Sequence, residues 1–189
     1  EAARKRLPNV RFDVADIDTW NDNGPFDVIF ANAVLQWVPD HATLLPSLVN
    51  KLAPGGSLAI QMPDNINEHS HRLMREVAAD GPWTGKLANA AGQRTDIESA
   101  SGYYSILKAC CTRVDVWRTT YHHPLAGGAS GVVEWFKGSG LRPFLEPLNE
   151  AERAQYLKQY QTAIEKAYPA LSDGSVLLPF PRLFMVATR

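Results

Sequence analysis

Short apolar segments of strand length recur along the chain, and their spacing predicts where the strands lie. Residues 26–31 are a nearly continuous apolar run, typical of a strand buried on both faces, and residues 57–62 are another short apolar strand. Residues 10–14 and 114–121 alternate apolar and polar side chains, which predicts strands with one covered face. Residues 182–188 close the chain as a further buried strand.

Helical periodicity and capping residues separate these strands. One helix is predicted to begin near Thr43, capped by Asp40 or by Thr43 itself, and to end at the Pro and Gly residues of 52–56. A longer helix over 149–168 starts with a capping-box spacing and carries Tyr156, Tyr160, Ile164 and Tyr168 at intervals of four. The other predicted helices cover residues 1–7, 68–79, 103–110 and 130–138, with a polar loop over 80–96.

The order of these elements predicts the fold class. Strands and helices alternate with short connections in the first half, which is typical of parallel βαβ units and an α/β sandwich. In the second half, two helices stand between two strand segments. This arrangement predicts a strand pair with a helical insertion over it.

Composition and charge exclude several classes of function. Nineteen Lys and Arg against twenty Asp and Glu give a net charge of −1, so the chain has no overall attraction for nucleic acid or anionic lipid. No apolar run approaches the roughly 18 residues that a membrane helix needs, and the charged first residues are not expected to form a signal peptide. The two cysteines, Cys110 and Cys111, are adjacent and fit a reducing compartment. We therefore expect a cytoplasmic protein with no membrane and no nucleic-acid partner.

Polar residues follow three of the predicted strands, at the edge where open parallel sheets bind ligands. Asp16 follows the first strand, Asn32 and the Gln36–Trp37 pair follow the second, and residues 63–65 follow the third. Asp16 alone could be a turn former or a helix cap. Three such positions on successive strands favour a ligand-binding edge.

Motifs for phosphate and metal binding are missing from the sequence. Gly138-Ser-Gly140 leaves a helix and follows no strand, so it is interpreted as a helix C-terminus and not as a dinucleotide-binding loop. The His69/His71 and His122/His123 pairs and the adjacent cysteines lack the spacing of zinc ligands. We therefore predict no metal site, and we interpret these histidines as surface residues.

Arginines beside prolines are the clearest candidates for binding an anion. Arg142 precedes Pro143, and Arg182 follows Pro181 at the start of a long apolar run, where an unpaired charge would be costly. Arg118 lies in an alternating strand. For each arginine, an ion pair with a neighbouring acidic residue is the alternative. Together with His122 and His123, these arginines indicate an anionic substrate.

Several longer motifs resemble a known family. Residues 26–41, followed by Leu-Ala-Pro-Gly-Gly at 52–56, resemble the second half of class I S-adenosylmethionine-dependent methyltransferases. Residues 59–65, 115–121, 138–143 and 180–187 resemble the trans-aconitate methyltransferase family within that class, and only residues 81–101 match weakly. The resemblance implies a Rossmann-like, mostly parallel sheet with an antiparallel C-terminal strand and a helical lid inserted before it, over about residues 129–170.

The resemblance also implies a function and a set of site residues. The cofactor is S-adenosyl-L-methionine, and the acceptor is a carboxylate of trans-aconitate or a similar small polycarboxylate, which becomes a monomethyl ester. No catalytic residue is expected beyond those that position the reactants, because a carboxylate is already ionised at neutral pH. Trp37 could face the donor cation or simply pack. The implied cofactor-binding residues are Asp16, Ile17, Asn32, Ala33 and Trp37, and the candidates for substrate binding are His122, His123, Arg142 and Arg182.

The family's Gly-rich loop and the acidic residue after its second strand are expected to precede Glu1. Residues 1–189 are therefore expected to be the C-terminal major part of one methyltransferase domain, which is a monomer when complete. Two alternatives stay open. The chain could act on another small acceptor, or it could be a truncated, non-catalytic interaction module that pairs through an exposed strand edge.

Overall fold

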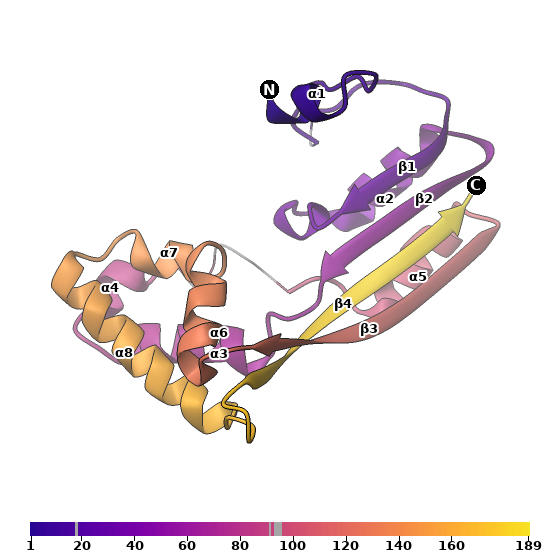
Figure 1. Ribbon diagram of the computed structural model, residues 1–189. Helices are drawn as coiled ribbons and strands as arrows, with labels where there is room; N and C mark the ends of the chain where they lie inside the picture. The colour runs from indigo at the N-terminus through magenta and orange to yellow at the C-terminus, as the bar shows by residue number, and fades with distance from the viewer. Residues whose placement is uncertain (18, 91, 93–95) are drawn as a thin grey trace.

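The computed structural model describes residues 1–17, 19–90, 92 and 96–189 (Figure 1). In these residues, β1 (Phe26–Asn32), β2 (Leu52–Pro63), β4 (Val176–Thr188) and β3 (Arg113–Leu125) form one sheet in that order. β1 and β2 are parallel, and β4 is antiparallel to both β2 and β3. β1, β2 and β3 therefore share one direction, which confirms a mostly parallel sheet with an antiparallel C-terminal strand.

Two helices cover one face of the sheet and form the first core. α2 (His41–Asn50) and α5 (Ala100–Lys108) lie behind the strands in Figure 1. Asp40 caps α2, since its carboxylate accepts a hydrogen bond from the backbone N–H of Thr43 at 3.2 Å. The side chains of this core are mostly aliphatic and include Leu45, Leu48, Leu58, Ile60, Leu107 and Met185. We call these strands and helices the sheet unit.

A second group of helices gathers at the far end of β3 and β4 (Figure 1). This helical unit consists of α3 (His69–Ala79), α4 (Thr84–Leu87), α6 (Gly128–Lys137), α7 (Arg142–Leu145) and α8 (Glu150–Ala167). α6, α7 and α8 lie between β3 and β4 in the chain, which confirms the predicted helical insertion; α6 and α8 are the two predicted helices, and the short α7 was not predicted. The unit has a core of its own, built around Trp83, Phe136, Tyr156, Tyr160 and Leu178.

The two units cover opposite faces of β4. Val176 and Leu178 are buried against the helical unit, whereas Leu183 and Met185 are buried in the core of the sheet unit. Even and odd residues of a strand point to opposite faces, so burial changes face within residues 179–182. That stretch of β4 lies where the two units meet.

Residues 10–14 do not form the predicted strand. The pattern alternates correctly, but a strand also needs a neighbour for its backbone hydrogen bonds, and in the described residues β1 pairs only with β2. The preceding helix is present as α1 (Ala2–Arg6).

The apolar sequence of β1 predicts burial on both faces, and this prediction is wrong. Val28 is 61% exposed and Phe30 is 70% exposed, because helices cover only the opposite face of this part of the sheet. Residues 52–56 also differ from the prediction, since α2 ends at Asn50 and β2 already begins at Leu52. Within the predicted loop over 80–96, α4 forms and Trp83 is fully buried, while residues 91 and 93–95 lie outside the described part.

Candidate functional site

A hollow of about 790 Å³ lies between the carboxyl ends of β1 and β2 and the helical unit. Its walls come from distant parts of the sequence, which the fold brings together. The sheet unit contributes Ala33, Gln36, Trp37, Pro63 and Phe180, and the helical unit contributes His71, Met74, Trp135, Phe136, Arg142 and Phe144. Trp37 lines the hollow and is 60% exposed, so part of the wall is a large ring accessible to a ligand.

A second hollow of about 520 Å³ lies on the other side of the segment that follows β1. Ile17, Ile29 and Leu48 give it an apolar lining, and Asn32 is its polar lining residue. Asn32 and Val34 line this smaller hollow, whereas Ala33, Gln36 and Trp37 line the larger one. The segment over 32–37 is thus the wall that the two hollows share.

Backbone and side-chain hydrogen bonds hold this shared wall in an unusual conformation. Ala33 has a φ of 53°, a region that residues with a Cβ rarely adopt. Its N–H donates to the carbonyl of Gln61 at 2.8 Å, and its carbonyl accepts from Nε2 of Gln36 at 2.8 Å. Oε1 of Gln36 is buried without a hydrogen-bond partner among the described residues. The larger hollow is therefore lined by a residue with an unused acceptor.

His41 ties the shared wall to α5. Its Nε2 lies 2.8 Å from the carbonyl of Leu35, which can only accept, so Nε2 is the donor and Nδ1 accepts from the hydroxyl of Tyr103 at 2.6 Å. The same hydroxyl accepts from the N–H of Glu98 at 3.2 Å. Burial raises the pKa of Tyr103 to about 12, so the phenol stays protonated and keeps these bonds at neutral pH.

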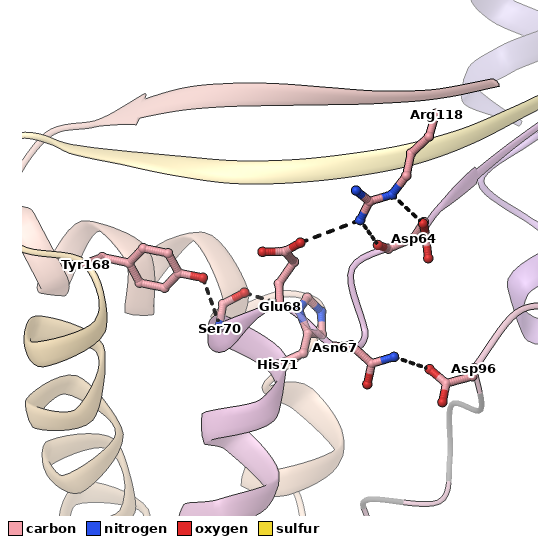
Figure 2. Close-up of polar contacts among 8 residues, drawn as sticks. All are labelled: Asp64, Asn67, Glu68, Ser70, His71, Asp96, Arg118 and Tyr168. Carbon is pink, nitrogen blue, oxygen red and sulfur yellow. Dashed lines mark hydrogen bonds and ion pairs between the residues drawn. The ribbon is translucent and has the colours of Figure 1, made fainter. Parts of the chain in front are cut away.

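Arg142 and Arg118 have different positions and partners. Arg142 lines the large hollow, and its guanidinium pairs with Glu146 at 2.7 Å, a contact that raises the pKa of Arg142. Arg118 pairs with Asp64 at 2.6 Å and with Glu68 at 3.7 Å, in the segment between β2 and α3 (Figure 2). Arg118 therefore fastens the junction of the two units and does not line the hollow.

Arg182 lies at the border of the large hollow. It pairs in register with Pro63, and its guanidinium carbon is 5.0 Å from the ring centre of Phe180, both of which line the hollow. Tyr121 approaches the guanidinium from a second side at 5.7 Å. Nη1 donates to Oε1 of Gln61 at 2.9 Å. Two rings and a side-chain amide thus fix the orientation of the guanidinium group.

The structure separates the two histidines of β3. His123 is packed with its ring centre 4.9 Å from that of Trp135 and 5.6 Å from that of Phe180, beside the hollow. His122 is exposed and points to the opposite face, because consecutive strand residues alternate. Of the predicted substrate-binding residues, the fold thus gathers Arg142, Arg182 and His123 and leaves His122 outside.

The predicted cofactor-binding residues divide between the two hollows. Ile17 and Asn32 line the smaller hollow, and Ala33 and Trp37 line the larger one. Asp16 is exposed near the smaller hollow, in which its neighbours Ala15 and Ile17 take part. The structure thus places these residues in or beside the shared wall over 32–37.

Sequence reasoning missed His71, which it had interpreted as a surface histidine. His71 is 7% exposed, lines the large hollow, and packs edge-on against Phe136 with ring centres 5.0 Å apart. Its Nδ1 lies 3.3 Å from Oγ of Ser70, as Figure 2 shows. The helical periodicity of residues 68–79 places Ser70, His71 and Met74 on the buried side of α3, and that was the available signal.

The described part of the chain provides neither a cluster of metal ligands nor a membrane-spanning helix. No group of three or more His, Cys, Asp or Glu side chains there is placed to hold a metal ion. None of the helices in that part has the length and apolar character needed to cross a membrane.

Comparisons with known protein families and curated proteins identify methyltransferases as relatives of this chain. A family model described as a methyltransferase domain matches residues 1–103. The chain is 57% identical to a trans-aconitate 2-methyltransferase of Methylobacterium nodulans, over 99% of this chain and 72% of that protein. A trans-aconitate 2-methyltransferase of Variovorax paradoxus is 51% identical, over 100% of this chain and 73% of that protein. The crystal structure of the YcgJ protein from Bacillus subtilis matches with a TM-score of 0.55 at 11% identity, covering 100% of this chain and 74% of that one, which supports the fold.

Proposed function

The chain belongs to the trans-aconitate 2-methyltransferase family, and from that premise we propose that it methylates a carboxylate of trans-aconitate with S-adenosylmethionine. The product is a monomethyl ester. One observation carries the proposal: two hollows share the wall over 32–37, and the larger has Arg142 in its lining and Arg182 at its border. A donor and an anionic acceptor could thus meet at one segment.

The residues around the shared wall fit S-adenosylmethionine. The smaller hollow combines an apolar lining with the amide of Asn32, which suits a flat base with polar edges, and Ile17 would pack against that base. Asp16 is exposed nearby and would accept hydrogen bonds from the nucleoside. On the other side of the wall, the exposed ring of Trp37 suits a cationic sulfonium. When bound, the group supplies an activated methyl.

The residues of this chain act on the acceptor by binding and orientation. A carboxylate is ionised near neutral pH and is itself the nucleophile, so no side chain has to remove a proton. Arg142 and Arg182 hold the other carboxylates. His123 packs against Phe180, the same ring that Arg182 contacts, and so supports the position of Arg182. Aromatic walls from Trp37, Trp135 and Phe136 exclude water from the acceptor, which favours transfer over solvation of the nucleophile.

The helices between β3 and β4 complete the proposed domain. α6, α7 and α8 fall within the proposed lid over about residues 129–170, and α6 and α7 line the hollow. We place the enzyme in the cytoplasm as a monomer when complete, with the adjacent Cys110 and Cys111 as free thiols.

The test is transfer of a labelled methyl group to trans-aconitate, with the ester identified by mass spectrometry. We expect Arg142→Met to raise the Michaelis constant for trans-aconitate about tenfold, the equivalent of about 1.4 kcal/mol, with little change for the methyl donor. Arg113→Met is the matched control, because Arg113 pairs with Asp115 outside the hollow. Label that enters another small acceptor but not trans-aconitate would overturn the proposed substrate.

A further inference from the structure

Arg182 differs from Arg142 and Arg118 because no carboxylate among the described residues pairs with it. Arg75, which lines the hollow, likewise has no carboxylate partner there, but it donates to the backbone carbonyl of Ile66 and not to a side-chain amide. Arg142 pairs with Glu146, and Arg118 pairs with Asp64 and Glu68. Arg182 is held instead by the neutral side-chain amide of Gln61 and by two ring faces. Its positive charge is therefore oriented but not compensated by the protein.

Gln61 is well placed to set this orientation. It lies in β2, two residues before Pro63, and pairs in register with Phe184, so its side chain shares a face of the sheet with Arg182. It is 4% exposed, and its Oε1 accepts from Nη1 of Arg182 at 2.9 Å. Its backbone carbonyl also accepts the N–H of Ala33 in the shared wall. One residue thus touches both the arginine and the segment between the two hollows.

The amide at this position leaves one of its buried polar atoms unpaired. Nε2 of Gln61 is buried without a hydrogen-bond partner among the described residues, and an unpaired buried donor is unfavourable. A glutamate of almost the same shape would have no such donor and could bind the guanidinium through a charge-assisted contact. It would also neutralise Arg182. The amide sacrifices a buried hydrogen bond and leaves the charge of the arginine available.

From this contrast we infer that Gln61 is a positioning residue that orients Arg182 while leaving its charge free for a carboxylate of the acceptor. The inference rests on the proposed function, since it concerns an anionic acceptor in the large hollow. It goes further by naming the residue that determines how strongly Arg182 attracts that anion.

Two substitutions of Gln61 distinguish this role from a structural one. Gln61→Met removes the acceptor but keeps the size, and we expect the dissociation constant for trans-aconitate to rise about fivefold. Gln61→Glu keeps an acceptor for Arg182 but neutralises it, and we expect a rise above twentyfold. A residue that only stabilised the fold would give the opposite order, because Glu retains the contact with Arg182. Calorimetry measures binding, and steady-state kinetics should show the same rise in the Michaelis constant for trans-aconitate, with kcat and the constant for the methyl donor within twofold.

A double-mutant cycle tests whether Gln61 acts through Arg182. In an Arg182→Met background, Gln61→Met should change binding less than twofold. The matched controls are Gln159→Met and Gln159→Glu, at an exposed position of α8 that does not line the hollow, and these should bind as the unsubstituted protein does. Thermal melting identifies a variant that does not fold, and the other variant then provides the test.

The outcomes separate this inference from the proposed function. If the unsubstituted protein neither binds nor methylates trans-aconitate, the proposed function is wrong. If it does both and Gln61→Glu binds as tightly as the unsubstituted protein, or if Gln61→Met has the same effect with and without Arg182, the role of Gln61 is wrong.

Discussion

The two cores of the molecule are stabilised in different ways. The sheet unit has a mostly aliphatic core, in which Leu58 and Leu107 are almost fully buried between strands and helices. In the helical unit, tyrosines of α8 also bind the backbone of α3: Tyr156 donates to the carbonyl of Met74 at 2.9 Å, and Tyr160 donates to that of Ser70 at 3.0 Å. The sheet unit is stabilised by the packing of aliphatic side chains, which depends on their volumes. Directional hydrogen bonds fix the position of α3 in the helical unit.

This difference matters because α3 forms part of the site. It contributes His71 and Met74 to the large hollow, and its N-terminal end is joined to β3 through the Glu68–Arg118 contact (Figure 2). The backbone N–H of Ser70 donates to the hydroxyl of Tyr168 at 3.1 Å, which Figure 2 also shows. The tyrosines of α8 and Tyr168 thus hold α3, one wall of the hollow, against α8, and Arg118 joins α3 to the sheet.

The substitution with the largest expected effect disrupts the core of the sheet unit. Leu58→Ala should lower the free energy of unfolding by about 2–5 kcal/mol, because Leu58 is 1% exposed and the change leaves a cavity between β2 and the helices. Urea denaturation followed by circular dichroism measures the loss. Leu171→Ala, at a 52% exposed position, is the control and should cost little. A loss below 1 kcal/mol for Leu58→Ala would contradict a tightly packed core.

A smaller effect tests the directional contacts of the helical unit. Tyr160→Phe keeps the ring and removes one hydrogen bond to Ser70, so the free energy of unfolding should fall by about 1 kcal/mol. Because α3 lines the hollow, we also expect weaker acceptor binding at unchanged affinity for the methyl donor. Tyr104→Phe, at a 46% exposed position, is the matched control. Equal unfolding energies for the two variants would show that the Tyr160 hydroxyl does not hold α3.

The last expected effect concerns a buried thiol of the sheet unit and appears at high pH. Burial raises the pKa of Cys111 from the ordinary 9 to about 11, so the folded thiol keeps its proton where the unfolded thiol loses it. The resulting stability is complete below pH 9 and is lost as the pH rises toward 11. The buried tyrosines contribute a similar loss only above their ordinary value of 10.

Unfolding measurements at pH 8, 9 and 10 under reducing conditions follow this loss. The Cys111→Ala variant should lose less stability over that interval than the unsubstituted protein, because it lacks the thiol. Identical slopes in the two proteins would mean that the thiol of Cys111 is not protected in the sheet unit.

Local features of the sequence predicted most of the elements. The capping box at the start of α8 is present in full, since Asn149 and Glu152 each bind the other's backbone N–H. The aromatic and aliphatic stripe of α8 faces the core of the helical unit as the spacing predicts. Such features depend on residues within one or two turns, and the chain alone specifies them.

The strand over 10–14 and the exposure of Val28 and Phe30 show where local pattern was insufficient. Alternation and apolar runs indicate that a segment suits a sheet, but the pairing strand and the covering helix come from elsewhere in the chain. The same reason explains why Gln61 and His71 were not identified as site residues. Their roles depend on Arg182 and Phe136, which lie far away in the sequence.

The sequence by itself determined the order of helices and strands, the caps, the resemblance to a methyltransferase family and the arginines suited to an anionic substrate. The tertiary structure decided which of those residues meet. Along β4, burial changes from the face with Leu178 to the face with Leu183, and no periodicity in the sequence specifies that change. It follows from two helical layers that pack on opposite sides of one strand, and it places Arg182 at the border of the hollow between them.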